Sequence, residues 1–508
     1  MNPNRDDEDA IKHQYAFGFI HLFIVPPEHV RPAGVSQCAR SGRAGQERVR
    51  EAHRGTRPRH ERNHLATFPD FLNLSEGSIE ERIAATIDAV STGVAVIYQG
   101  VLRSHLPVEG TEVIGIPDFL IVDEGTYRIR DCKLSRHADE ENHPEILRQV
   151  ELYGWLFEQT FRKKPSLLEV YLGDETLKPL QYRGGSSTID TLSRIQRLSA
   201  QAEEPYSPVG WSKCEQCQFR DRCWAIATAS QDVATVYELD QCTALALREA
   251  GVFSIGDLLS RFDEHSLSEL KKPRGDKMVR VGAAAARILL QADALMQNKE
   301  KLIAPLRLPG AGNMVMFDLE GLPPQFSELD KVYLWGTQVF GEKPGEFKPA
   351  LATFGLDGDK EGWNGFLENS ASIFKEYGDI PFIHYTHYET TKLNGYVKRY
   401  GNPNKVAARV LKNCVDLYKI IKESLVLPEH SYGLKVLEKR AGFERTMDEF
   451  GGNWSIVQYV RAVETQDESQ RQQIMNDILK YNREDLQATW AVVEWLSKTY
   501  LYGKSALA

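Results

Sequence analysis

Apolar and polar residues alternate in two short runs between positions 115 and 135, in the stretch GIPDFLIVDEGTYRIRDCKLS. Alternation with a period of two is typical of β-strands, and Glu124-Gly125 between the runs predicts a two-residue hairpin turn. Pairing outward from this turn places Asp118 directly opposite Asp131, with both carboxylates on one face. The pattern therefore predicts an antiparallel hairpin that carries two facing acids.

The two facing acids need a counter-charge. Facing positions of an antiparallel pair lie about 5 Å apart, and like charges there destabilise a sheet unless something neutralises them. A divalent metal ion would do so, and Lys133, on the same face as Asp131, could stabilise a developing phosphate charge or orient an attacking water. The alternative is a surface hairpin with scattered charge. The apolar IPDFLIVD setting argues against it, because a carboxylate in a half-buried strand usually has a function.

The same kind of pattern divides the rest of the first half into helices and strands. Apolar residues at helical spacing predict helices over residues 78–91 and about 145–161, and apolar runs predict strands over 93–102 and 166–174. With the hairpin, the order is helix, strand, hairpin, helix, strand. This order predicts a mixed sheet flanked by helices.

The hairpin motif resembles that of a known nuclease superfamily. Pro117-Asp118 followed by Asp131-Cys132-Lys133 is similar to the core of PD-(D/E)XK nucleases in their RecB-like branch, with Asp in the third motif where Glu is commoner. The resemblance implies a restriction-endonuclease-like mixed-sheet domain. In it, Asp118 and Asp131 would bind metal and Lys133 would stabilise charge during phosphodiester hydrolysis.

Two flanking motifs extend this resemblance. Gln149 and Tyr153 lie one helical turn apart and share a face, and RecB-like nucleases carry a Q-x-x-x-Y helix soon after the hairpin. The resemblance gives both residues a role in ordering the site or the bound strand. Upstream, His60 is the candidate for the histidine metal ligand of the first RecB-like motif. Pro58 interrupts the helix expected there, and a solvated histidine is the alternative.

Three cysteines form the pattern C-x2-C-x5-C at Cys214, Cys217 and Cys223. Thiolates this close in a reducing compartment indicate a metal site, most often zinc. Downstream of a RecB-like core, however, the triplet resembles the iron-sulfur variant of these nucleases, in which a fourth cysteine lies far upstream. That resemblance implies a structural 4Fe-4S cluster with Cys38 as its fourth ligand, and Zn2+ is the alternative.

A second group of acids lies in the last third of the chain. A near-continuous apolar strand runs into Asp318 and Glu320, which are two residues apart and therefore point to the same side of the strand. A second predicted strand ends in Glu389. Tyr481 opens the predicted last helix, with Asp485 one turn behind it on the same face. Paired oxygen ligands of this kind suit Mg2+ or Mn2+.

The order of these residues resembles the DEDD 3'-5' exonucleases, which have a ribonuclease H-like fold, and is most similar to their YprB-type branch. By that resemblance Asp318, Glu320, Glu389 and Asp485 hold two metal ions about 4 Å apart, and Tyr481 positions the nucleophilic water. Glu389 stands where Asp is usual, and its extra methylene could displace one metal.

Two secondary candidates accompany this group. Asp416 and Lys435 lie between the second and third acidic motifs, in NCVDLYK and SYGLKVLEKRAGF. A helix-capping aspartate and a solvated lysine are the alternatives for them.

Length and composition give the frame. With 508 residues, 42% hydrophobic and 26% charged, the chain reads as an ordinary soluble protein of about three domains. Its net charge of -9 does not indicate nucleic-acid binding, although a local basic groove remains compatible with it. Seven cysteines make no disulfide framework, which favours a reducing, cytoplasmic location. The apolar run over residues 15–27 is too short to span a membrane.

The predicted fold is α/β, with four parts. They are an irregular basic leader, a RecB-like domain that includes the cysteines, a helical spacer, and a ribonuclease H-like α/β domain, over residues 1–54, 55–230, 231–300 and 310–508. The leader is either an arm that contacts nucleic acid or a poorly specified segment. The spacer has a short turn at Gly251 between two helices, similar to helix-hairpin-helix units that hold a phosphate; a plain spacer is the alternative.

Together these resemblances imply a metal-dependent DNA nuclease of repair, recombination or CRISPR adaptation. It would act on single-stranded or double-stranded DNA, with a helicase as a partner and no membrane association. Two other functions use the same residues. One is a nucleic-acid-binding scaffold with one or both sites inactive, and the other is a ribonuclease.

Overall fold

The computed structural model describes the chain in two compact units. The described residues are 23–25, 60–106, 112–135, 137–140, 143–199, 201, 208–210, 214, 217, 219–274, 277–323, 330–355, 358–447 and 452–502. Residues up to 201 belong to the first unit and residues from 208 to the second. Cys38 and most of the predicted leader lie outside the described residues.

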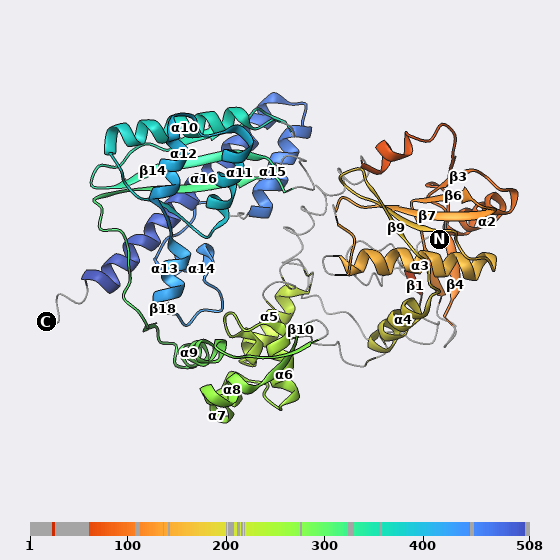
Figure 1. Cartoon of the computed structure of the whole chain (residues 1–508), viewed down its shortest axis with the longest axis horizontal. Helices are drawn as coiled ribbons and strands as arrows, with labels where there is room; N and C mark the ends of the chain where they lie inside the picture. The colour runs from red at the N-terminus through yellow and green to blue at the C-terminus, as the bar shows by residue number, and fades with distance from the viewer. Residues whose placement is uncertain are drawn as a thin grey trace, which may run out of the picture. The chain divides into compact units, whose positions relative to one another are not determined.

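The first unit contains a mixed six-stranded sheet of order β2-β3-β6-β7-β8-β9 and a three-stranded sheet of order β1-β5-β4 (Figure 1). Its strands are β1 Phe23–Val25, β2 Leu72–Asn73, β3 Val96–Tyr98, β4 Leu102–His105, β5 Glu112–Gly115, β6 Phe119–Asp123, β7 Thr126–Cys132, β8 Leu168–Tyr171 and β9 Leu177–Leu180. Its helices are α2 Ile79–Thr92, α3 Pro144–Phe161 and α4 Ser186–Ser199, besides a short helix over residues 60–65. Strand β7 pairs antiparallel with β6 and parallel with β8, as a mixed sheet requires.

Local sequence signals explain these elements. Ser78 caps α2 with a complete capping box, and α3 covers the helix predicted over 145–161. The hairpin is confirmed: Glu124 and Gly125 have φ of 46° and 76°, the left-handed pair of a type I′ turn. The strand predicted over 93–102 is instead broken, because Gln99 has a φ of 59° and separates β3 from β4.

The second unit opens with a helical segment. It comprises α5 Arg220–Ala229, η2 Val233–Thr235, α6 Gln241–Glu249, α7 Ile255–Arg261, α8 Glu264–Glu269, β10 Lys271–Arg274, β11 Lys277–Arg280, α9 Ala284–Gln297 and β12 Lys301–Leu302. These elements share an apolar core of their own. Gln291 on α9 donates to the carbonyl of Leu427 at 2.5 Å and accepts from the Tyr432 hydroxyl at 2.8 Å. The segment is therefore tied to the α/β part that follows.

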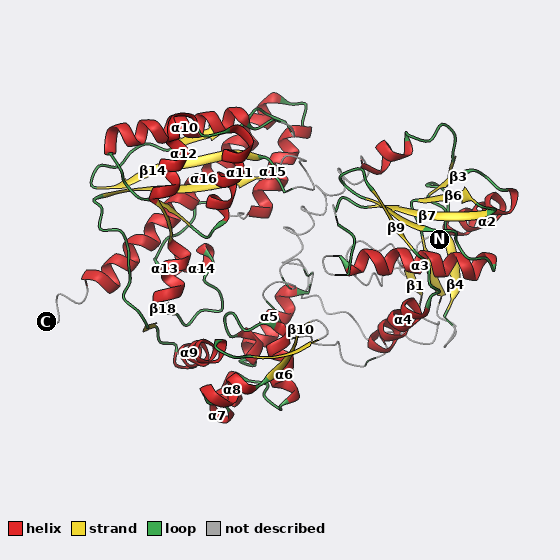
Figure 2. Cartoon of the chain, viewed as in Figure 1, coloured by secondary structure: helices red, strands yellow, loops and turns green. Residues whose placement is uncertain are grey.

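That α/β part is built on a five-stranded sheet of order β15-β14-β13-β16-β17 (Figure 2). Its strands are β13 Asn313–Gly321, β14 Val332–Gly341, β15 Lys348–Leu351, β16 Phe382–His384 and β17 Cys414–Asp416, with β18 Leu425–Val426 pairing to β12. Its helices are α10 Lys360–Tyr377, α11 Tyr388–Tyr400, η3 Pro403–Lys405, α12 Val406–Asn413, α13 Leu417–Ser424, α14 Leu434–Arg440, α15 Gly452–Glu464, α16 Glu468–Leu496 and η4 Ser497–Tyr502. The acids predicted on a first strand therefore lie on the central strand β13.

Two predicted boundaries in this part are wrong. Glu389 does not end a strand: β16 stops at His384, and Glu389 lies in the first turn of α11. Tyr481 does not open the last helix, because α16 begins at Glu468, where the Asp467 side chain caps it. Both residues are consequently held by helices, and Tyr481 and Asp485 still share one face of α16.

Candidate metal centres

The first candidate centre lies where β7 ends. The observed register runs from Asp123 opposite Thr126 to Phe119 opposite Arg130, as the sequence predicts, and Asp118 and Asp131 are the next residues on either side. Both aspartates are buried, with 2% and 0% of their surface exposed. The Asp118 carboxylate accepts the backbone N–H of Cys132 at 2.7 Å, which takes the place of the next ladder bond. Asp118 is thereby fixed to the end of the strand that carries Asp131.

A network that the sequence did not predict holds Asp118 from its other side. Gln99 donates from Nε2 to Asp118 at 3.0 Å and to Glu61 at 2.6 Å, and the Tyr98 hydroxyl donates to the same Glu61 oxygen at 2.8 Å. Gln99 adopts a left-handed backbone conformation that a non-glycine residue seldom takes, and such conformations concentrate at functional sites. Glu61 is thus joined to the predicted centre through Gln99.

Asp131 is a buried carboxylate that receives no hydrogen bond from the described residues. Within the part of the chain that the structure describes, neither of its oxygens accepts a hydrogen bond, and its counter-charge is the Lys133 ammonium, which forms an ion pair with Oδ2. A buried carboxylate needs more than one such partner to offset the loss of hydration. A carboxylate with a single cation and no described hydrogen-bond donor fits the metal-ligand role proposed for Asp131.

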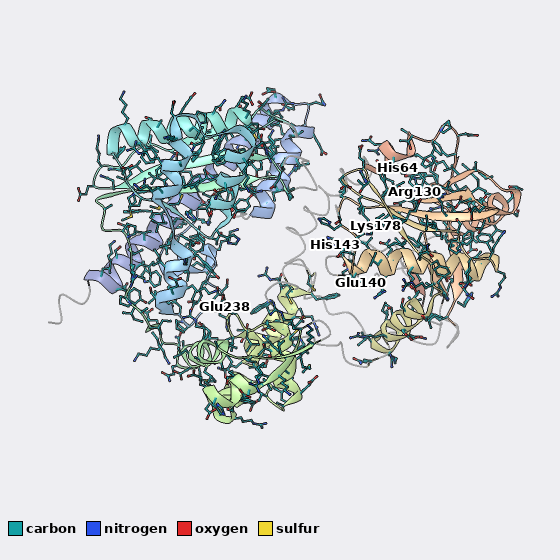
Figure 3. All side chains as sticks on the ribbon, viewed as in Figure 1. His64, Arg130, Glu140, His143, Lys178 and Glu238 are labelled. Atoms are coloured by element: carbon teal, nitrogen blue, oxygen red, sulfur yellow. The ribbon has the colours of Figure 1, made fainter. Side chains whose placement is uncertain are left out.

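The opposite face of β7 carries a structural network. Arg130 donates to Glu169 at 2.6 Å and lies 2.9 Å from His64 Nε2 (Figure 3). The His64 ring stacks on Tyr171 at 3.8 Å. Alternation along the strand therefore separates Arg130 from Asp131, so this ion pair does not neutralise the candidate centre.

His60 is not gathered with the two aspartates into one group of ligands. Among the described residues, no set of three ligand atoms within 4.8 Å includes it. Its ring stacks on Tyr171 at 4.9 Å, and its Nε2 is buried with no hydrogen-bond partner in the described chain. Burial lowers the pKa of His60, which keeps the imidazole neutral, the form that binds metal. The role of His60 as a ligand stays a prediction.

The Q-x-x-x-Y pair lies on the buried face of α3. Gln149 donates from Nε2 to the Tyr153 hydroxyl at 2.6 Å, and both side chains are almost fully buried. Tyr153 packs in the core between α3 and the sheet. The structure thus joins the two residues to each other, as their spacing predicted.

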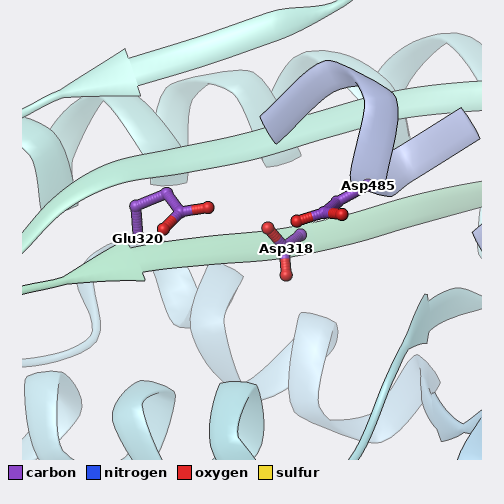
Figure 4. Close-up of side chains that lie close together, drawn as sticks. All are labelled: Asp318, Glu320 and Asp485. Carbon is purple, nitrogen blue, oxygen red and sulfur yellow. The ribbon is translucent and has the colours of Figure 1, made fainter. Parts of the chain in front are cut away.

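The second candidate centre joins a strand and a helix. Asp318 and Glu320 on β13 and Asp485 on α16 offer three carboxylate oxygens that all lie within 4.8 Å of one another (Figure 4). Met314 and Met316, on the same face of β13, pack in the core that α16 helps to form. Alternation along β13 therefore points the acid pair at α16, and this group is the sole one of its kind in the described chain.

A missing side chain lets the helix approach the acids. Gly336 on β14 lies directly opposite Asp318, and a Cβ at that position would meet Asn482 Oδ1 at 1.8 Å. Asn482, in α16, is fully buried and donates to Asp318 Oδ2 at 2.7 Å. The sequence reasoning passed over Asn482, although it lies three residues before Asp485 and so on the same side of the helix.

Mutual repulsion marks these acids as a site for cations. Burial, and then the neighbouring Asp485, raises the pKa of Asp318 well above its ordinary range. The same two causes raise the pKa of Glu320 to about 8. Ser455 donates to Glu320 at 2.5 Å, which only partly offsets them. Three crowded carboxylates with raised pKa values are the donor set that Mg2+ or Mn2+ prefers, so the residues fit the metal that the resemblance implies.

Glu389 stands close to this group but outside it. It is 3% exposed, and its charge is among the causes that raise the pKa of Asp318. Its Oε2 lies 3.5 Å from His384 Nδ1 and has no hydrogen-bond partner among the described residues. The three-carboxylate group does not include Glu389. Glu389, which stands where the resemblance expects Asp, is therefore the one predicted ligand of this centre whose carboxylate lies outside the group.

Cations and a tyrosine surround Asp485. Arg445 forms an ion pair with Asp485 and two hydrogen bonds of 2.8 and 2.7 Å with Glu438. Lys435 and Arg445 lie 5.8 and 5.7 Å from the centre of the Tyr481 ring, and burial followed by Asp485 raises the pKa of Tyr481 well above its usual value. No motif in the sequence singled out Arg445 or Glu438.

The secondary candidates divide. Asp416 caps α13 by accepting the backbone N–H of Lys419 at 2.9 Å, which is the alternative weighed for it. Lys435 is partly buried beside Tyr481, and its burial lowers its pKa. It is therefore not a freely solvated lysine.

The cysteine triplet lies in the second unit. Cys214 and Cys223 pack against the apolar core of the helical segment, and Cys214 Sγ accepts the N–H of Gly210 at 3.2 Å. Thiolates around a zinc ion would lie roughly 3.8 Å apart. In the described chain, Cys214, Cys217 and Cys223 do not gather their sulfurs within 4.8 Å. The iron-sulfur and the zinc assignments of these cysteines both stay predictions.

Each of the two candidate centres lies in a segment that matches a known family. Residues 31–224 match the family model of the PD-(D/E)XK nuclease superfamily, and residues 315–497 match that of the RNase_H superfamily. Neither the curated proteins nor the solved structures contain a match. Within the described residues, no helix has both the length and the apolar character to cross a membrane.

Proposed function

We propose that this chain, which carries one domain of the PD-(D/E)XK nuclease superfamily and one domain of the RNase_H superfamily, is a metal-dependent DNA nuclease with two separate active centres. Phosphodiester hydrolysis is the reaction that both superfamilies support. The observation that carries the proposal is the group of Asp318, Glu320 and Asp485, whose crowded oxygens need cations between them.

In the second centre, the three carboxylates would hold the divalent ions, which activate a water and neutralise charge on the phosphate. Asn482 orients Asp318, and Arg445 orients Asp485. The Tyr481 hydroxyl is protonated at neutral pH, as an ordinary tyrosine is, and burial raises its pKa further, so it would donate a hydrogen bond to the attacking water or to a phosphate oxygen. We assign this centre to 3'-5' exonuclease action.

In the first centre, Asp118 and Asp131 would hold the ion, and Lys133 would place its charge beside the phosphate. Glu61 is a further carboxylate linked to Asp118 through Gln99, and the motif resemblance adds His60 as an imidazole ligand. Gln149 and Tyr153 would order the helix that backs the strand carrying Asp131.

For the cysteines we propose a structural iron-sulfur cluster held by Cys214, Cys217, Cys223 and Cys38. An absorption spectrum of anaerobically purified protein tests it, because an iron-sulfur cluster absorbs in the visible range and zinc does not. Cys217→Ser should lose the cluster and the cooperative unfolding of the helical segment. Soluble, cooperatively folded Cys217→Ser protein without metal would refute the structural role.

The test of the whole proposal is digestion of labelled single-stranded DNA with Mg2+ or Mn2+, compared with the chelated enzyme. Asp131→Ala and Asp318→Ala should each remove part of the activity, and the double variant should remove all of it. Asp190→Ala, an exposed aspartate on α4, is the matched control. RNA offered in competition decides between deoxyribonuclease and ribonuclease action.

If the protein binds DNA but does not cleave it, the nuclease proposal is wrong and the chain is a nucleic-acid-binding scaffold with inactive sites. A cellular role in repair, recombination or CRISPR adaptation, beside a helicase, is the setting we propose for the activity.

A further inference from the structure

The helical segment of the second unit carries a concentrated positive charge. Residues 271–280, KKPRGDKMVR, contain five Lys or Arg and one Asp, in a chain whose net charge is -9. They form β10 and β11, an antiparallel pair that makes a two-stranded sheet of its own. We call these described residues, 271–274 and 277–280, the basic hairpin.

The register of the basic hairpin sets cations against cations. Lys271 pairs with Arg280, and Arg274 pairs with Lys277. Like charges at facing positions of an antiparallel pair destabilise it unless an opposite charge lies close by. Both pairs would therefore be stabilised by a nearby anion, which either the chain itself or a bound partner has to supply.

The chain supplies little of that anion. Among the described residues, none of Lys271, Arg274 and Lys277 lies within 4.0 Å of an acidic side chain. Arg280 has a partner, Glu269 at 3.3 Å, but that pair is exposed on both sides, at 63% and 47%. Exposed pairs of this kind contribute little. Three cations of the hairpin are consequently available to a partner.

The hairpin is held firmly at its base. Lys272 points back to α6, where it forms an ion pair with Asp240 and donates to Thr243 at 2.9 Å. The backbone N–H of Val281 donates to Leu270 at 2.9 Å and closes the base of the hairpin. The three cations that have no acidic partner among the described residues therefore project from a support held at its base, and little ordering of the backbone would oppose their binding to a ligand.

We propose that the basic hairpin contacts the phosphate backbone of the nucleic-acid substrate. Arg274 and Lys277 face each other beside the turn, and strand alternation places Lys271 on the other face, so the hairpin presents positive charge on both faces to a polyanion such as nucleic acid. Met278, 61% exposed on the face that carries Lys271, adds an apolar surface for a base or sugar. The inference rests on the proposed function only for the nature of the ligand, a nucleic acid. The known motif residues of both superfamilies lie elsewhere in the chain.

Protection of an exposed sheet edge is the competing explanation, because Lys and Pro on edge strands prevent pairing with other chains. Charge of either sign serves that purpose. Binding of phosphates requires positive charge. Reversal of the charge therefore separates the two explanations.

The experiment measures binding of fluorescent DNA to the full-length protein by anisotropy, in EDTA so that no cleavage intervenes, over a series of salt concentrations. The variant is Lys271→Glu, Arg274→Glu and Lys277→Glu together. The control reverses three exposed cations that have acidic partners elsewhere in the second unit, Lys343, Arg409 and Lys419. Both variants change the net charge equally.

The hairpin variant should bind on the order of tenfold more weakly or worse, with the salt slope of log K reduced by about 3, and the control should bind as the wild type does. Equal binding of all three proteins overturns the proposal, as does an equal loss in both variants. If DNA binds but is never cut by the wild type, the proposed enzyme fails while the hairpin inference stands.

Discussion

Gly336→Ala offers a sharp test of how the second centre is assembled. The new Cβ would lie 1.8 Å from Asn482 Oδ1 and 2.8 Å from its Cγ, whereas ordinary contact begins near 3.4 Å. About 1.6 Å of movement, the difference between 3.4 and 1.8, is needed to relieve the overlap. The Asn482 amide cannot simply turn away, because it is buried and bonded to Asp318.

Two responses are open to the variant, and both harm the site. If Asn482 rotates, Asp318 loses its donor and a buried amide is left unsatisfied, at a cost of about 1–3 kcal/mol. If α16 moves instead, Asp485 is carried away from Asp318 and the metal ligands separate. A displacement of about 1 Å in a catalytic site typically lowers the rate on the order of 10²-fold.

The assay is exonuclease activity in an Asp131→Ala background, which silences the first centre, together with urea unfolding. Gly395→Ala is the matched control, because its helix position on α11 has nothing within 4 Å of the added Cβ. It should keep full activity and gain up to about 1 kcal/mol of stability. Wild-type activity and metal affinity in Gly336→Ala would refute the close approach of α16 as the basis of the site.

Three further predictions follow from the two centres. In an Asp318→Ala background, Lys133→Ala should lower the cleavage rate roughly 10²–10³-fold and leave DNA binding unchanged. The control Lys178→Ala, at an exposed lysine on β9, should leave the cleavage rate unchanged, and equal rates in the two variants would overturn the role of Lys133. The pKa of Glu320 is about 8 in the folded protein, against an ordinary 4.5. In the metal-free protein, the contribution of Glu320 to the free energy of unfolding should therefore be greatest below pH 4.5 and be lost as the pH rises to about 8. Thermal unfolding should show Mn2+ restoring it and Glu320→Gln flattening the dependence, and an unchanged pH profile in that variant would contradict the assignment. Arg445→Ala should lower the free energy of unfolding in urea by about 3–5 kcal/mol, because Glu438 and Asp485 stay buried after their ion-pair partner is removed. Arg409→Ala removes an exposed ion pair and should lower it by less than about 1 kcal/mol, and similar losses in both variants would contradict a buried network.

Several parts of the fold depend on neighbours along the chain and were therefore predictable from residue patterns. Strand alternation and the Glu124-Gly125 turn predicted the β6–β7 hairpin and its register, because a two-residue turn fixes which residues face each other. Helical spacing likewise predicted α3 and the shared face of Gln149 and Tyr153. The pairing of Asp318 with Glu320 needed only the two-residue period of a strand.

Contacts between residues that are distant in sequence could be seen only in the folded chain. The sequence around Arg445 does not predict its ion pair with Asp485, and the sequence around Glu61 does not predict its link to Asp118 through Gln99. Both depend on how helices and strands pack. For the same reason the sequence did not single out Gly336. Its missing side chain leaves space for Asn482, which lies almost 150 positions away along the chain. Periodicity specifies a face within one element, but only packing specifies which other element that face will meet.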